Sequence, residues 1–209
     1  GLILGNGASI AVHAGFSYSG LLSEAKRLGF LGEDVEQIFR RFNVEDFELV
    51  LRHLWHSKMV FNALKLTGDP VDRVNAAYLA VRTALIQTVR ATHVSYDDAL
   101  PHLEHIYKYL RKFKTVLSLN YDLIVYWAAQ YGNNALGNRY HFKDCFDGTR
   151  RFPEEWQSKR QAYRGISDPT LYFYPHGNLA LVQEPDYKER KVVLAPYSDG
   201  QLLGTILNL

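Results

Sequence analysis

Polar residues that could take part in catalysis gather in three short segments of the chain, each after an apolar run. They are residues 5–9 (Gly-Asn-Gly-Ala-Ser), residues 120–122 (Asn-Tyr-Asp) and residues 176–177 (His-Gly). Glycines can bring backbone N–H groups close to a phosphate, an amide can hold a water or a hydroxyl, and a histidine can move a proton near neutral pH. If the three segments lie together in the fold, they could form a functional site.

The first segment suggests a phosphate site, but weakly. Gly5 and Gly7 lack a Cβ, and a helix starting here would add its partial positive charge. However, many strand–helix turns carry such glycines for tight packing alone. The third glycine of the usual Rossmann fingerprint is also absent, because Ile10 stands at that spacing.

The other two segments also have structural interpretations. Asn120 could hold a ribose hydroxyl or a water, and Asp122 could accept a hydrogen bond from an amide, but Asn and Asp after a strand often form turns or cap helices. His176, next to the small Gly177, suits a general base, or it is a loop histidine satisfied by the backbone. Taken singly, none of the three segments establishes a site.

Apolar runs predict the strands that would position these segments. We expect strands at residues 1–4, 115–119 and 171–174, and two more at 179–182 and 192–194 separated by a charged turn over 184–190. Strands alternating with helices favour an α/β fold with a Rossmann-like, mostly parallel sheet and helices on both faces. Ligands bind such sheets at the carboxyl ends of the strands, where all three segments would meet.

Helical periodicity fills most of the region between the first two strands. We expect a large helical insertion at about residues 20–113, within a single domain that spans residues 1–209. The expected helices cover residues 21–30, 33–42, 44–66, 69–93 and 103–113, and another follows the second strand at 123–131. Residues 132–151 are expected to be loop with short strands.

Composition excludes some classes of function. The formal net charge of +2, from 24 basic and 22 acidic residues, gives no electrostatic argument for binding nucleic acid or a membrane surface. The single cysteine, Cys145, cannot form an internal disulfide or a four-cysteine zinc site. We therefore expect a cytoplasmic protein without a structural metal, and we interpret the chain as an excerpt of a longer protein.

The ordered set of three segments resembles the sirtuin family. Its members carry Gly-Ala-Gly-x-Ser, Thr-Gln-Asn-Ile-Asp and a catalytic His-Gly, against Gly-Asn-Gly-Ala-Ser, Leu-Asn-Tyr-Asp and Tyr-Pro-His-Gly-Asn here. The chain is more similar still to the sirtuin-like domains of bacterial proteins, several of which hydrolyse NAD in anti-phage defence. The resemblance spans residue 1 to about residue 196.

This resemblance implies an NAD glycohydrolase that uses NAD as substrate and needs no cofactor or metal. Asn120 would contact the nicotinamide ribose and help to place the attacking water, and His176 would be the general base. Asp122 would hold the nicotinamide carboxamide. The remaining substrate contacts would come from the glycine segment and from the residue after the histidine: Gly5, Asn6, Gly7, Ala8, Ser9 and Gly177.

Two departures separate the chain from protein-deacylating sirtuins. It cannot build their four-cysteine zinc module, and Gly15-Phe16-Ser17-Tyr18 replaces their Gly-Ile-Pro-Asp-Phe-Arg segment. Hydrolysis of NAD is therefore favoured over deacylation. The alternative is a non-catalytic module that senses NAD or ADP-ribose and controls an effector or an assembly.

The resemblance also implies partners. In related defence systems such domains are held inactive until a partner, often a ring ATPase or a phage-sensing module, changes the assembly, and we expect a homo-oligomer here. The aromatic residues of the helical insertion fit a surface for self-association, and core packing explains the same residues. Its histidine pair His53 and His56, like His102 and His105 further on, is better explained by helix flanks than by a metal site.

Overall fold

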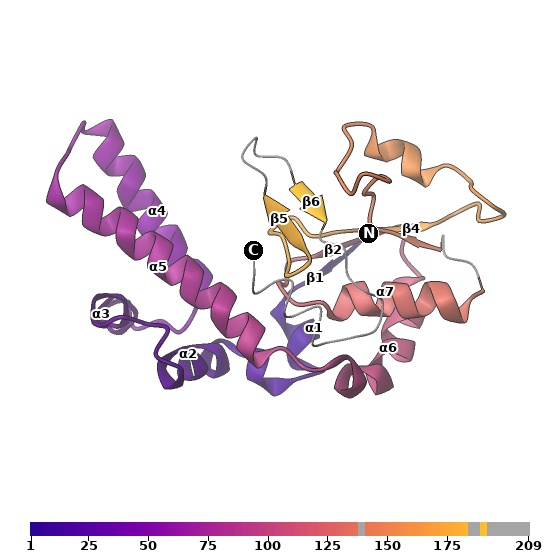
Figure 1. Cartoon of the computed structure of the whole chain (residues 1–209), viewed down its shortest axis with the longest axis horizontal. Coiled ribbons are helices and arrows are strands. Elements are labelled where there is room, and N and C mark those ends of the chain that lie inside the picture. The colour runs from indigo at the N-terminus through magenta and orange to yellow at the C-terminus, as the bar shows by residue number, and fades with distance from the viewer. Residues whose placement is uncertain (138–140, 184–188, 192–209) are drawn as a thin grey trace. The chain divides into compact units, whose positions relative to one another are not determined.

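A computed structural model of the chain describes residues 1–137, 141–183 and 189–191. Its sheet contains β1 (Leu2–Leu4), β2 (Thr115–Ser118), β3 (Phe142–Lys143) and β4 (Thr170–Phe173), in the order β1-β2-β4-β3. Every neighbouring pair is parallel, which confirms the predicted α/β class with a Rossmann-like sheet (Figure 1). The strands run the same way, so their carboxyl ends lie at one edge.

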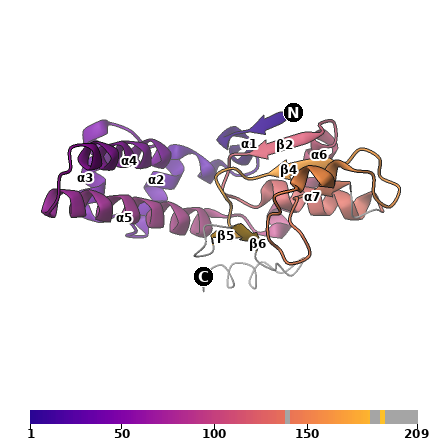
Figure 2. The ribbon, with the colours of Figure 1, turned by 90° about the horizontal axis from the view of Figure 1, so that it is seen from above.

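The two faces of this sheet are covered differently. Val116 and Tyr172 are paired across β2 and β4 and are buried on the face that carries α7 (Ile124–Ala135). The helix α6 (Tyr96–Leu110) packs beside α7 on the same side (Figures 1 and 2). On the opposite face Phe173 contacts Trp156 of the short 3-10 helix η2 (Trp156–Arg160).

The short strand β3 is held in the sheet partly by a side chain. Asn133 of α7 donates a hydrogen bond to the carbonyl of Phe142 at 3.0 Å and accepts one from its N–H at 2.8 Å. Asn133 is buried, and these two bonds replace those that a further strand would make. The helix α7 therefore runs to Ala135, beyond the predicted end at residue 131, into a segment predicted to be loop.

A separate antiparallel pair contains β5 (Leu181–Gln183) and β6 (Glu189–Lys191). The prediction of a turn over residues 184–190 was wrong at its end, because residues 189 and 190 already belong to β6. The strand predicted at residues 192–194 lies outside the described residues.

The chain divides into two compact units, Gly1–His13 with Val94–Leu209, and Ala14–His93. The second unit is helical and contains η1 (Ala14–Phe16), α2 (Tyr18–Arg27), α3 (Glu33–Phe42), α4 (Phe47–Ala63) and α5 (Asp69–Thr92). As a compact body it is shorter than the insertion predicted at residues 20–113, because α6 packs with α7 in the sheet unit.

Side chains cap the first turns of α2, α4 and α6. The predicted bounds 21–30 and 44–66 differ from the observed Tyr18–Arg27 and Phe47–Ala63. Asp46 caps α4 by accepting the N–H groups of Glu48 and Leu49, and α3 has the predicted bounds. The prediction that α6 starts at residue 103 was wrong. Ser95 accepts the N–H of Asp98 and starts the helix at Tyr96, so Pro101 lies inside it.

None of the helices within the described ranges is both long enough and apolar enough to cross a membrane.

Candidate functional site

The three polar segments follow parallel strands at the same edge of the sheet. Gly5 follows β1 and begins the turn into α1 (Asn6–Ile10), Asn120 and Asp122 follow β2, and His176 follows β4. Since β1-β2 and β2-β4 are parallel neighbours, the convergence predicted from the sequence is confirmed for the strands that carry these segments.

A chain of hydrogen bonds joins the first two segments. The side-chain amide of Asn120 donates to the carbonyl of Gly5 at 3.1 Å and to the hydroxyl of Ser9 at 2.6 Å. The Ser9 hydroxyl in turn donates to a carboxylate oxygen of Asp122. All three side chains are buried, so each bond is formed in a setting where a lost partner would be costly.

The direction of these bonds fixes how Asn120 is oriented. A carbonyl oxygen can only accept, so the nitrogen of the Asn120 amide must face Gly5. That leaves Oδ1 of Asn120 as an acceptor, and no side chain or backbone N–H of the described residues donates to it. Among the described residues, the side-chain oxygen of Asn120 therefore keeps its capacity to accept a hydrogen bond.

Both carboxylate oxygens of Asp122, which is expected to contact the nicotinamide carboxamide, already accept hydrogen bonds from the protein. One of its oxygens accepts the Ser9 hydroxyl, and the other accepts the N–H of Ile124 at 2.9 Å, at the start of α7. It is only 3% exposed. These contacts make Asp122 first of all a positioning residue, which orients Ser9 and the turn, although each oxygen can accept one more bond.

The two glycines of the first segment are not required by packing or by backbone conformation. A Cβ built on Gly5 or Gly7 would meet no described atom within 4 Å, and neither residue has a positive φ. Both are exposed, and Asn6 and Ala8 between and after them are half-buried. Within the described residues, tight packing therefore does not explain these glycines, and a Cβ at either position would have room.

The dipole of the following helix adds little to this segment. The helix α1 has only 5 residues, and the N–H of Ala8 is already used in a bond to the carbonyl of Gly5 at 3.0 Å. A macrodipole grows with the number of aligned peptides, so any anion would be held mainly by local N–H groups.

His176 lies in a tight turn at the end of β4. The N–H of Gly177 donates to the carbonyl of Tyr174 at 2.9 Å, with Pro175 and His176 as the central residues of the turn. Pro175 sets the φ of the first central position, and Gly177 has a φ of 76°, which favours glycine. The side chain of His176 is exposed, and no described residue bonds to it.

The turn that carries His176 is tied to the segment that carries Asn120. The N–H of Leu179 donates to the carbonyl of Tyr121 at 2.9 Å. Tyr174, which begins the His176 turn, is buried, and burial together with the negative charge of Asp122 raises the pKa of its hydroxyl well above the usual range. The second and third segments thus form one connected edge of the sheet.

A fourth polar residue lies at this edge and was not predicted. Asp144 directly follows β3, accepts the N–H of Phe146 at 3.3 Å and forms an ion pair with Lys191. Both side chains are mostly buried. The signal was present in the sequence, since an aromatic and basic run ends at an aspartate, but two residues are too few to be recognised as a strand.

A family model described as Domain of unknown function (DUF4917) matches residues 2–209. The chain belongs to this family. No curated protein shows a significant match to it. The parallel sheet and the polar edge built from residues 5–9, 120–122 and 176–177 therefore belong to a member of this family.

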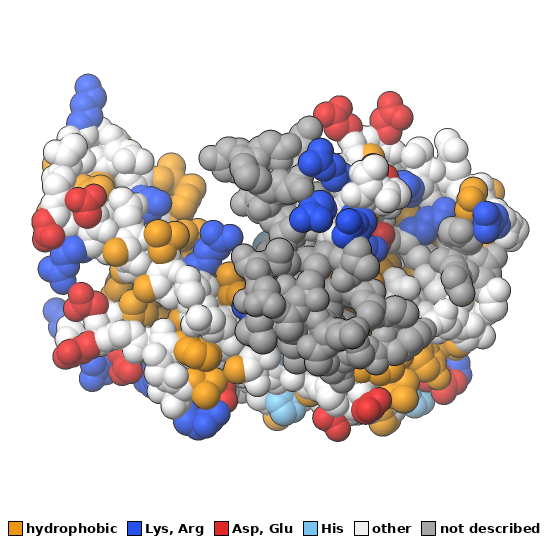
Figure 3. All heavy atoms as spheres, in the orientation of Figure 1, with side chains coloured by type: hydrophobic (Ala, Val, Ile, Leu, Met, Phe, Trp, Pro, Cys, Tyr) orange, Lys and Arg blue, Asp and Glu red, His pale blue; other side chains and the backbone are white. Residues whose placement is uncertain are grey.

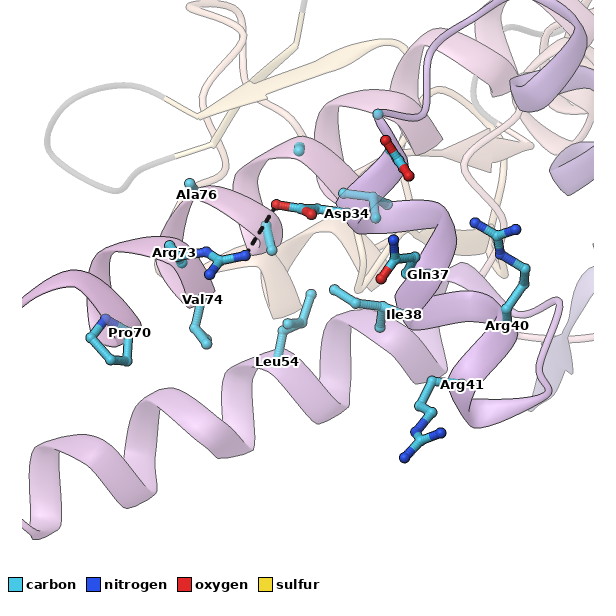
Figure 4. Close-up of a pocket in the computed structure, with 15 residues that line it drawn as sticks. Asp34, Gln37, Ile38, Arg40, Arg41, Leu54, Pro70, Arg73, Val74 and Ala76 are labelled. Atoms are coloured by element: carbon cyan, nitrogen blue, oxygen red, sulfur yellow. Dashed lines mark hydrogen bonds and ion pairs between the residues drawn. The ribbon is translucent and has the colours of Figure 1, made fainter.

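The largest of the described hollows lies in the helical unit and contains none of these edge residues. A cavity of about 1210 Å³ lies in the helical unit between α3 and α5, with Leu54 of α4 at its floor (Figure 4). Its rim carries an exposed ion pair between Arg73 and Asp34 at 3.4 Å. Within the described ranges no group of three or more His, Cys, Asp or Glu side chains is placed to hold a metal.

Proposed function

We propose that the chain is an NAD glycohydrolase, which cleaves the bond between nicotinamide and ribose. The observation that carries the proposal is the bond chain from Asn120 through Ser9 to Asp122 at the carboxyl edge of a parallel sheet. It leaves Oδ1 of Asn120 without a donor among the residues that the structure describes. The identity of the substrate comes from the resemblance to sirtuin-like domains. The geometry of this edge is compatible with that substrate.

The reaction needs oriented groups more than a strong acid. The bond from ribose C1′ to the pyridinium nitrogen breaks, its electron pair goes to the nitrogen, and nicotinamide leaves as a neutral molecule. Water adds to C1′ and loses one proton, so the products are nicotinamide, ADP-ribose and H⁺. The transition state is like an oxocarbenium ion, which is favoured when the water and the ribose hydroxyls are held in place.

Each residue of the edge has a part in this proposal. Oδ1 of Asn120 accepts a hydrogen bond from the water or from a ribose hydroxyl, and its amide is fixed by Gly5 and Ser9. His176, exposed at the end of β4, takes the proton. The open backbone of Gly5 and Gly7, with Asn6 and Ala8, takes the pyrophosphate.

Asp122 and Gly177 act mainly through their neighbours. Asp122 orients Ser9, and through it Asn120, while one oxygen keeps the capacity to accept an N–H of the nicotinamide carboxamide. Gly177 allows the turn that presents His176. In this scheme NAD is the substrate, and no cofactor or metal takes part.

The proposal extends to the cellular role and to assembly. Depletion of NAD by a cytoplasmic enzyme would serve anti-phage defence, with a ring ATPase or a phage-sensing protein as the activating partner. A homo-oligomer through the helical unit fits the exposed hydrophobic side chains of α4, which include Trp55, Met59 and Val60. Figure 3 shows hydrophobic side chains gathered over the helical unit.

The experiment that tests the function is release of nicotinamide from NAD, followed by chromatography. The wild type is expected to release nicotinamide and ADP-ribose in equal amounts, and Asn120→Ala to release neither. A protein that binds NAD tightly but leaves it intact with its activating partner present would instead be the sensing module. Absence of both binding and cleavage would refute the proposal.

A further inference from the structure

A second hollow lies on the opposite face of the sheet from α7. Its floor contains Thr115 and Leu117 of β2 and Phe173 of β4, and its volume is about 370 Å³. It extends past the end of β4 to Pro175, the residue directly before His176. The volume is in the range of sites for small molecules, and the position is at the edge where open α/β sheets bind their ligands.

The lining of this aromatic cavity is made mostly of rings. Six aromatic residues border it: Phe146, Phe152, Trp156, Tyr172, Phe173 and Tyr174. The ring of Tyr172 itself lies on the face that carries α7, so the hollow is lined mainly by the rings of the other residues. The rings of Trp156 and Phe173 lie 5.1 Å apart edge to face, and those of Phe146 and Phe152 lie 5.6 Å apart. Such pairs hold one another in place, so their remaining faces are preorganised for a further ring.

Several of these rings are only half covered by the protein. Phe146, Phe152 and Trp156 are each half-buried, and Leu117 and Phe173 below them are half-buried as well. Apolar surface that faces a cavity loses the free energy of burial, and a flat apolar ligand would restore it. The shape and chemistry of the lining therefore favour a planar ring over a flexible or a charged group.

One polar side chain at the border of the cavity can accept a hydrogen bond from a ligand. Asp144 borders it, and the two carboxylate oxygens already accept one hydrogen bond each, from Lys191 and from the N–H of Phe146. A carboxylate can accept about two bonds at each oxygen, so Asp144 can still receive an N–H from a ligand. Because Lys191 balances its charge, a neutral donor is suitable.

We propose that the aromatic cavity binds a planar heteroaromatic ring that carries an NH₂ group. Nicotinamide and adenine share this chemistry, and the choice between these two rings rests on the proposed function. The cavity lies beside the His176 turn and uses none of the residues assigned above to catalysis. It is a ring-binding subsite in addition to the Asn120 edge.

The test measures dissociation constants of nicotinamide and adenosine for the full chain by titration calorimetry. Nicotinate and inosine are the matched controls, since each replaces the NH₂ group by oxygen. One of the two amino compounds is expected to bind, and its control at least about 10-fold more weakly. The compound that binds identifies the source of the ring, and binding of neither would overturn the proposal.

Variants locate the binding. Trp156→Ala is expected to weaken it at least about 10-fold, while Trp55→Ala, a half-exposed tryptophan in the helical unit, leaves it unchanged. If Trp156→Ala fails to fold, Leu117→Phe fills the floor without removing a ring, and it should block binding in the same way. Binding that survives both substitutions, or the one that folds, would place the ring elsewhere and overturn the proposal.

Cleavage of NAD by the same proteins separates this proposal from the proposed function. Ring binding that depends on Trp156, without any cleavage by the wild type, would refute the glycohydrolase and leave the subsite standing. Cleavage with an unchanged KM in Trp156→Ala would refute the subsite and leave the glycohydrolase standing.

Discussion

The hydroxyl of Ser9 donates a hydrogen bond to the carboxylate of Asp122, 113 positions later in the sequence. This contact fixes the turn after β1 against the turn after β2, and the same hydroxyl receives the amide of Asn120 at 2.6 Å. The orientation of Asn120 therefore depends on a residue pair that does not itself need to touch substrate.

A double-mutant cycle measures this dependence. Ser9→Ala leaves Asp122 with a buried and unsatisfied oxygen, and is expected to lower the free energy of unfolding by about 1–3 kcal/mol. With Asp122→Ala alongside, the coupling energy is expected to be about 0.5–3 kcal/mol. Urea unfolding of the two single variants and the double variant gives the value. Strict additivity of the two changes would contradict the contact.

Gly7→Ala tests whether the first segment binds the pyrophosphate. The substitution is expected to raise the stability of the protein and to weaken NAD binding. Gly7 lies within α1 and has room for a Cβ, so alanine should raise stability by up to about 1 kcal/mol. The same methyl group would obstruct a pyrophosphate, and NAD binding should weaken at least about 10-fold.

Gly132→Ala is the matched control for this change. A Cβ there would lie 2.7 Å from the ring of Phe142 and 2.9 Å from Tyr107, so about 1–3 kcal/mol of stability should be lost. Thermal melts and NAD titrations of both variants provide the comparison. Unweakened NAD binding by Gly7→Ala would refute the phosphate role of this segment.

Cys145 is expected to be unreactive in the folded protein. It is 1% exposed, and burial, followed by the negative charge of Asp144, raises the pKa of its thiol from 9.0 to about 12. At pH 8 only about one thiol in 10⁴ is then ionised, and the thiolate is the reactive form. Iodoacetamide should label the protein only after denaturation, and rapid labelling of the native chain would contradict this burial.

From the raised pKa of this thiol we predict how the free energy of unfolding changes in alkaline solution. The unfolded chain loses the proton near pH 9, while the folded chain holds it to about pH 12. Stabilisation by the protonated thiol is therefore complete below pH 9 and is lost as the pH rises from about 9 to 12. Cys145→Ala should reduce this slope of unfolding free energy against pH, and an identical slope would exclude the contribution.

The exposed hydrophobic side chains of α4 predict self-association. Trp55 and Met59 are 48% and 51% exposed, one helical turn apart. Light scattering after gel filtration should give a multiple of the monomer mass of 24.0 kDa, and replacement of both residues by Ser should give the monomer. Tyr109→Ser, at 48% exposure in the sheet unit, is the control. A wild type that stays monomeric at tens of micromolar would refute the proposed interface.

Long periodic elements and strand–turn segments could be predicted from the sequence. The bounds of α3 were predicted to the residue because acidic residues open it and an apolar face repeats through it. The convergence of residues 5–9, 120–122 and 176–177 followed from the rule that parallel strands end at one edge.

What the sequence did not reveal depends on contacts between distant residues. The two-residue strand β3 exists because Asn133 satisfies the backbone of Phe142, and no local pattern encodes that bond. Asp144 was therefore not recognised as part of the edge. In the same way, the role that the resemblance implied for Asp122 was a contact with substrate, and it did not include the hydrogen bonds that Asp122 forms with Ser9 and Ile124.

The central claim is that Asn120 and His176 carry the cleavage of NAD. The most direct measurement follows nicotinamide release by the wild type, Asn120→Ala, His176→Ala and His102→Ala, with folding checked by circular dichroism. His102 is also exposed, lies in the same unit and is distant from the edge in sequence. Release by the wild type and His102→Ala, but not by the other two variants, is the predicted result. Undiminished release by a folded Asn120→Ala or His176→Ala protein would contradict the account.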